Sequence, residues 1–168
     1  QVLEAPEARL SLATPFSAPR AEGRIAARYA GLDLRLDLDG EPEGERLRIR
    51  RLDAAFGPAR LEASGLLDPG AATFAGEVAL AADDLAPFSG LAGTPLAGRL
   101  ALRGRLDAPG GVQGFDLALD IPAASAGGTP LGGRLAARGT LAALEAELEA
   151  RAMDARLTTR ASMAEEAG

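Results

Sequence analysis

Apolar and polar residues alternate strictly along much of the chain. The clearest stretch is LDLRLDLD at 32–39, where four leucines would lie on one side of a β-strand and charged residues on the other. Similar alternation runs through 46–50, 74–80, 98–106 and 115–121. Turn sequences rich in glycine and proline, such as DPG at 68–70 and APGG at 108–111, separate these stretches. The pattern predicts an all-β chain of short strands joined by hairpins.

Two segments carry helical signals. Residues 141–152, LAALEAELEARA, have helical periodicity and propensity, but read as a strand they place Leu148 and its alternate neighbours on one side and glutamates on the other. No N-cap residue and no closing glycine mark a helix there, which favours a strand and leaves both structures open. Residues 84–91 begin with a possible cap, Asp84, and end near Gly93. They predict one short helical turn, and no longer helix is expected.

The chain repeats itself. TPLAGRLALRGRL at 94–106 and TPLGGRLAARGTL at 129–141 are identical at ten of thirteen positions. Looser copies begin at Gly23 and Ala59, so the approximate repeat starts are 23, 59, 98 and 133. Repeats of this length bury their apolar face by stacking on their neighbours, and such an array can continue past both ends. We therefore expect residues 1–168 to be one fragment of a longer repetitive protein.

The composition lacks most of the residue types that enzymes use for catalysis. The chain has no Cys, no His and no Lys, so a thiol nucleophile, an imidazole base, a Schiff-base lysine and the usual zinc ligands are all missing. The acidic run at 37–45 has Pro42 where a calcium-binding EF-hand loop needs glycine, which favours a solvated turn. We expect no enzyme activity, no catalytic residue, no metal site and no cofactor.

Charge and hydropathy limit the classes of partner that we expect for this chain. The formal net charge is −6 and the 18 arginines are interspersed with acidic residues, which argues against nucleic acid because phosphate binding needs a basic face. No run approaches 18 consecutive apolar residues, and the opening residues lack the pattern of an export signal. Membrane spanning and an export signal within these residues are therefore not expected.

Three sequence features together resemble the TamB family, the AsmA-like envelope proteins of Gram-negative bacteria. They are the Gly-Arg-Leu-x-x-Arg-Gly-x-Leu strands, FGPARLEASGLLDPG at 56–70 and DDLAPFSGLAG at 83–93, and the likeness covers most of the chain. The resemblance implies a single elongated curved β-sheet, or β-taco, with an apolar concave face, in a periplasmic protein anchored in the inner membrane. It implies phospholipid acyl chains as cargo between the inner and outer membranes, and an outer-membrane assembly protein of the Omp85 type as a partner of the parent protein.

Two functions from different classes follow. One is a lipid-conducting groove segment, and the other is a structural or chaperone-like β-scaffold whose exposed edges assist outer-membrane protein assembly. An apolar sheet face is also compatible with the core of a closed sandwich. Aromatic residues make up only 4% of the chain, and Gly and Ala stand beside Leu, which leaves little side-chain volume for a sealed core and favours a groove. The candidate groove-lining residues are Leu34, Leu36, Leu47, Ile49, Leu61, Phe74, Val78, Leu80, Leu100, Leu102, Phe115, Leu117, Leu119, Leu135 and Leu148.

Overall fold

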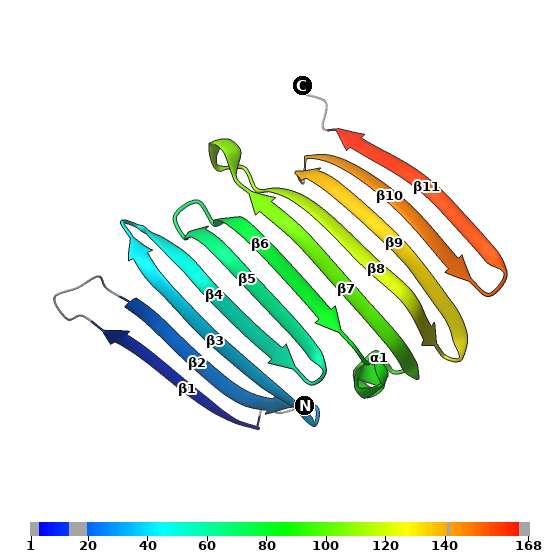
Figure 1. Ribbon diagram of the computed structural model, residues 1–168, viewed down its shortest axis with the longest axis horizontal. Helices are drawn as coiled ribbons and strands as arrows, with labels where there is room; N and C mark the ends of the chain where they lie inside the picture. The colour runs from blue at the N-terminus through cyan, green and yellow to red at the C-terminus, as the bar shows by residue number, and fades with distance from the viewer. Residues whose placement is uncertain (1–3, 14–19, 141, 165–168) are drawn as a thin grey trace.

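The computed structural model describes residues 4–13, 20–140 and 142–164. Within these residues, eleven antiparallel strands form one sheet in which each strand pairs with the next along the chain (Figure 1). The strands are β1 (Glu4–Ala13), β2 (Arg20–Tyr29), β3 (Leu32–Glu43), β4 (Arg46–Phe56), β5 (Ala59–Asp68), β6 (Thr73–Ala82), β7 (Leu96–Asp107), β8 (Gly114–Ala126), β9 (Thr129–Thr140), β10 (Ala143–Ala152) and β11 (Ala155–Ala164). The predicted all-β fold is confirmed.

The segment with mixed signals at 141–152 is a strand from Ala143 onward, and residue 141 lies outside the described residues. Strand β10 pairs with β9 on one side and β11 on the other, so the ladder on both edges outweighs helical propensity. The predicted helical turn is confirmed as a 3₁₀ turn η1 (Ala86–Phe88) continued by α1 (Ser89–Ala92). A second 3₁₀ turn, η2, spans Pro109–Gly111. In the described part of the chain, no helix has the length and apolarity to cross a membrane.

The strand register aligns apolar residues into an unbroken row. Starting in β2 and following the paired positions across the sheet to β10, each strand contributes one residue to a line that we call the central row. Its members are Ile25, Leu36, Ala54, Leu61, Leu80, Leu102, Leu119, Leu135 and Leu148. Neighbouring strands lie about 4.8 Å apart, so these side chains form a continuous apolar line perpendicular to the strands. We call the side of the sheet that carries this row the apolar face and the opposite side the polar face.

Two β-bulges keep the apolar residues on the same face. In β4, Ile49 and Leu52 are three residues apart, yet their partners in β5 are only two apart, so the chain holds an extra residue at Arg50–Arg51. Strand β8 has the same irregularity after Ile121. Because side chains alternate with period two, the register would otherwise turn the rest of each strand over. The bulges thus preserve one apolar face where the sequence changes its phase.

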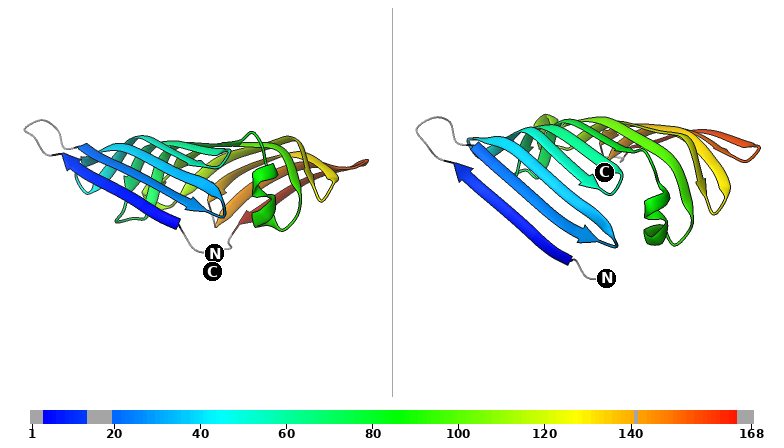
Figure 2. Two further views of the ribbon diagram at one scale, coloured as in Figure 1. Left: turned by 90° about the horizontal axis from the view of Figure 1, so that it is seen from below. Right: turned by 60° about the horizontal axis from the view of Figure 1, so that its bottom comes forward.

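The sheet is curved. Figure 2 shows it as an arch whose strands also bend along their length. Glycines inside strands permit such bending, and Gly98 and Gly139 have φ of 100° and 128°, values that side chains disfavour. Bulges and interior glycines of this kind are the usual means of bending a β-sheet. The predicted single curved sheet is confirmed.

The described residues place no second layer over the sheet. Among the described residues, the buried hydrophobic side chains are Ile49 and Ala82 only. The chain exposes 11654 Å² of surface, whereas a compact protein of 17.1 kDa exposes about 7,700 Å². The residues that would form the core of a sandwich therefore lie on one open face.

Candidate functional site

All fifteen candidate lining residues lie on the apolar face. The register places Leu34 and Leu36 on β3, Leu47 and Ile49 on β4, Leu61 on β5, Phe74, Val78 and Leu80 on β6, Leu100 and Leu102 on β7, Phe115, Leu117 and Leu119 on β8, Leu135 on β9 and Leu148 on β10. Ile49 is buried and the other fourteen are half-buried. Residues far apart in sequence thus share one surface across eight strands.

The same face holds apolar residues that are not among the fifteen candidates. Ile25 and Leu38 extend it toward β2, and Leu131 extends it on β9. The alternation around these positions was a usable signal for them. Leu52 and Ile121 stand next to the two bulges. The alternation at 115–121 places Ile121 on this face, whereas no sequence pattern marks the bulge beside Leu52, so the place of Leu52 becomes visible only from the strand register.

A glycine pair in the middle of the face is covered by an aromatic ring. Gly65 on β5 lies opposite Gly76 on β6. A Cβ atom placed on either glycine would come within 2.8 or 2.9 Å of Cζ of Phe74, so the end of the ring covers both glycines. On the next strands, a Cβ on Gly104 would collide with the side chain of Leu117. Large neighbours thus fill the space that the glycines leave between β5 and β8.

At the β8–β11 end, the face is hollowed instead. A depression of about 370 Å³ opens there. Its apolar lining consists of Leu119, Ile121, Leu131, Gly133, Leu135, Leu148, Ala150, Ala152, Ala155 and Leu157. Part of the rim is open to solvent, with Leu131 39% and Leu157 55% exposed. Within 4–13, 20–140 and 142–164, no acidic side chain lines this hollow.

The helical turn docks an aromatic side chain on the apolar face. Phe88 of η1 lies 5.8 Å, centroid to centroid, from Phe56 at the end of β4, which in turn lies 6.5 Å from Tyr29. The hydroxyl of Ser89 accepts a hydrogen bond from the backbone N–H of Leu96 (2.9 Å) and donates one to the carbonyl of Ala86 (2.7 Å). This hydroxyl therefore fixes the turn to the start of β7.

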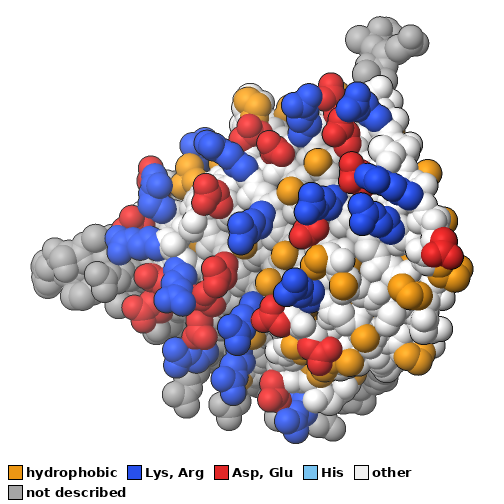
Figure 3. All heavy atoms as spheres, turned by 45° about the vertical axis from the view of Figure 1, so that its right-hand side comes forward, with side chains coloured by type: hydrophobic (Ala, Val, Ile, Leu, Met, Phe, Trp, Pro, Cys, Tyr) orange, Lys and Arg blue, Asp and Glu red, His pale blue; other side chains and the backbone are white. Residues whose placement is uncertain are grey.

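The polar face carries a ladder of ion pairs between strands. Figure 3 shows arginine and acidic side chains interspersed over this surface. Arg24 on β2 pairs with Asp37 on β3, and Arg138 on β9 pairs with Glu145 on β10. The hydrogen bond and charge of Asp37 raise the pKa of Arg24. Water screens such exposed pairs, so they add little to stability and mainly keep this face solvated.

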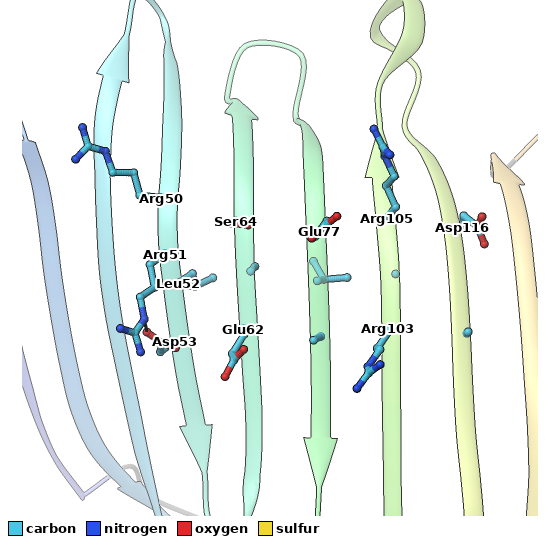
Figure 4. A pocket seen from close by; sticks show the side chains of 15 residues that line it. Arg50, Arg51, Leu52, Asp53, Glu62, Ser64, Glu77, Arg103, Arg105 and Asp116 are labelled. Carbon is cyan, nitrogen blue, oxygen red and sulfur yellow. Dashed lines mark ion pairs between the residues drawn. The ribbon is translucent and has the colours of Figure 1, made fainter.

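A shallow depression of about 720 Å³ lies mainly on the polar side of β4–β8 (Figure 4). Its charged lining comprises Arg50, Arg51, Arg103, Arg105, Asp53, Glu62, Glu77 and Asp116. Four arginines and four carboxylates balance each other, so the depression selects neither anions nor cations. Across the residues the structure describes, no three acidic side chains are grouped closely enough to hold a metal ion.

Comparisons of the chain with family models, with curated proteins and with solved structures return no match.

Proposed function

We propose that this chain is a segment of a periplasmic lipid bridge whose apolar face conducts phospholipid acyl chains between the inner and outer membranes. The observation that carries the proposal is the central row, which crosses nine strands without a polar residue. No layer of the described chain covers that row. The periplasmic location, the membrane-anchored parent protein and its Omp85-type partner rest on the TamB-like motifs.

The curve of the sheet supports a track on its concave side. Figure 2 shows the helical turn, in green, on the inner side of the arch. Phe88 of that turn contacts Phe56 of the apolar face. We therefore take the apolar face to be the concave one. A concave surface contacts a narrow hydrocarbon chain on several sides, which increases the apolar area that binding removes from water.

The energetics of a lipid tail explain why continuity matters. Burial is worth about 0.8 kcal/mol per CH₂, so a sixteen-carbon tail resists entering water by about 13 kcal/mol. A tail that slides along the central row exchanges one apolar contact for another and avoids this barrier. Sliding needs no bond cleavage and no cofactor within the segment. Hydrocarbon recognition also needs no hydrogen-bonding group on the track, which agrees with the residues present.

Lipid content of matched variants tests the proposal. The chain would be produced in the envelope of a Gram-negative host, and lipid extracted from the folded protein would be quantified by mass spectrometry. Leu102→Asp places a charge in the central row, and Arg103→Gln changes the adjacent residue on the polar face. We expect phospholipid with the wild type and with Arg103→Gln, and a loss of about tenfold or more with Leu102→Asp while circular dichroism stays unchanged.

Other outcomes would contradict the proposal. Absence of lipid from the wild type, or full lipid content in a folded Leu102→Asp variant, would remove its basis. Unfolding of Leu102→Asp would indicate a sealed core instead of an open track. Binding of unfolded outer-membrane strands at β1 or β11, without lipid, would favour the scaffold function.

A further inference from the structure

We infer that the hollow over β8–β11 is a seat for a single acyl chain, the place on the apolar face where a lipid tail resides. This inference rests on the proposed function and adds a location to it. A uniformly apolar face would hold a tail equally well at every strand. The described face is not uniform, because its larger gaps are filled by its own side chains in one region and left open in another.

The seat has a floor of small residues. Gly133 on β9 lies opposite Ile121 on β8 and Ala150 on β10. One pair further along, Ala152 on β10 lies opposite Ala155 on β11. The three atoms closest to a Cβ placed on Gly133 would be the carbonyl oxygen and carbon of Glu149 and Cα of Ala150, at 3.2 Å, all of them backbone atoms. Among the described residues, the hollow opens over this floor.

Branched aliphatic side chains form the walls. Leu135 and Leu131 flank Gly133 along β9, and Leu148 precedes Ala150 along β10. Leu157 on β11 pairs with Ala150 from the other side. The result is a trough one small residue deep with apolar walls on its sides.

The contrast with β5–β6 shows that the trough is specific to this region. There, two glycines face each other just as Gly133 faces Ala150, but the ring of Phe74 covers both of them. Gly104 is likewise covered by Leu117. An arriving hydrocarbon chain finds no comparable space at those positions, whereas the β9–β10 trough forms an open hollow among the described residues.

Size and chemistry identify the occupant. A volume of about 370 Å³ is at the small end of the range for ligand pockets, about 300–1,000 Å³. A stable protein partner needs a contact area of at least about 1,000 Å², which is far larger than the surface of this hollow. Arg134, Arg151 and Arg156 contribute to the lining, yet the register places their side chains on the polar face, where Arg134 lies opposite Asp120 and Arg151 lies opposite Arg156. The surface offered to the ligand is hydrocarbon, which fits one acyl chain.

A photoreactive probe can test the seat. The probe is palmitic acid carrying a diazirine near the end of its chain, with the labelled peptides mapped by mass spectrometry. We expect labelling concentrated on 131–135 and 148–157. Ala150→Phe imitates Phe74 and should reduce this labelling about tenfold. Ala146→Phe, on the same strand and face but outside the hollow, should leave it unchanged.

Each outcome distinguishes the seat from the track. Labelling spread evenly over the apolar face, or unaffected by Ala150→Phe, would overturn the seat and leave the lipid track intact. Absence of labelling from the whole chain would overturn both. A crosslinked dimer joined through β9–β11 would assign the hollow to a second copy and overturn the seat. If Ala150→Phe does not fold, Ala152→Leu fills the same trough with a smaller side chain and must give the same loss of labelling.

Discussion

The β5–β6 and β9–β10 hairpins share a backbone arrangement and differ in what lies on it. In the first, Gly65 faces Gly76 and the Phe74 ring covers both. In the second, Gly133 faces Ala150, and among the described residues both line an open hollow. The β5–β6 hairpin thus fills the space over its small residues with its own side chain, whereas the β9–β10 hairpin leaves that space open to a ligand.

This difference shows how a single-layer sheet can be stable and still bind a ligand on its apolar face. Without a second layer, each strand must obtain its apolar contacts from neighbours on the same face. Side chains that cover glycines, such as Phe74 and Leu117, provide those contacts and occupy the space that a ligand would use. Leaving the trough open at one end keeps binding and self-packing in separate regions.

The largest effect should come from Gly76→Ala. The added Cβ would lie 2.6 Å from Cα of Gly65 and would also collide with the carbonyl oxygen of Ser64, so two backbones would have to separate. We expect a loss of at least about 3 kcal/mol in the free energy of unfolding, measured by urea titration. The control is Gly90→Ala in α1, where a Cβ has open space and the change should stay within about 0.5 kcal/mol. Equal losses in both variants would contradict the packing described for β5–β6.

Phe74→Ala should convert the filled hairpin into an open one. Phe74 is half-buried, so we expect a loss of about 2 kcal/mol, below the 3–5 kcal/mol typical of a fully buried Phe. The uncovered Gly65–Gly76 pair should then gain labelling by the photoreactive fatty acid. A destabilised variant with no new labelling would show that an open floor alone does not seat a tail.

The carboxylate of Asp68, at the end of β5, should make a pH-dependent contribution to the free energy of unfolding. The backbone N–H of Ala71 donates to it at 3.0 Å and Arg46 pairs with it at 2.9 Å, and these contacts lower the pKa of Asp68. Because folding lowers this pKa, the ionised carboxylate stabilises the folded sheet at pH values above the pKa of an unfolded Asp, about 3.9. This stabilisation is lost as the pH falls through the lowered pKa of the folded state. The wild type should therefore exceed Asp68→Asn in urea midpoint at pH 7, and the difference should shrink steadily below pH 4. A constant difference would refute this assignment.

The smallest effect should come from Arg103→Gln on the polar face. Arg103 is exposed, lies opposite Ala79 and Ala118, and takes part in no ion pair with another described residue. We expect a change within about 0.5 kcal/mol in unfolding free energy and unchanged lipid content. A larger loss would mean that the polar face contributes to packing or to binding.

Sequence alone predicted the strands and their faces well. Strict alternation at 32–39 and 98–106 sufficed to place leucines together, because period two leaves only two possible sides. The bulge at Arg50–Arg51 escaped prediction because two adjacent arginines resemble any polar pair. The strand state of 143–152 stayed open because Ala, Leu and Glu favour a helix, and only pairing with β9 and β11 decides otherwise.

The trough itself was beyond sequence reasoning. Of its walls, Leu119, Leu135 and Leu148 were predicted to line a groove, but Gly133 and Ala150 have no signal of their own. Their importance arises from lying opposite each other across β9 and β10, which depends on the hairpin register. The covering of Gly65 and Gly76 by Phe74 likewise depends on the register. Small residues become a floor only when the strands are aligned.

The central claim is that acyl chains lie on one face of this sheet, and paramagnetic broadening of leucine methyl resonances tests it most directly. Palmitic acid with a nitroxide near its terminal carbon would be added to the chain with labelled leucine methyls. Leu66 is an internal control, because it lies on the polar face of β5 opposite Ala75, whereas Leu102 and Leu119 lie in the central row. We predict strong broadening of Leu102 and Leu119 and a sharp Leu66 signal. Equal broadening of all three, or none, would contradict the account.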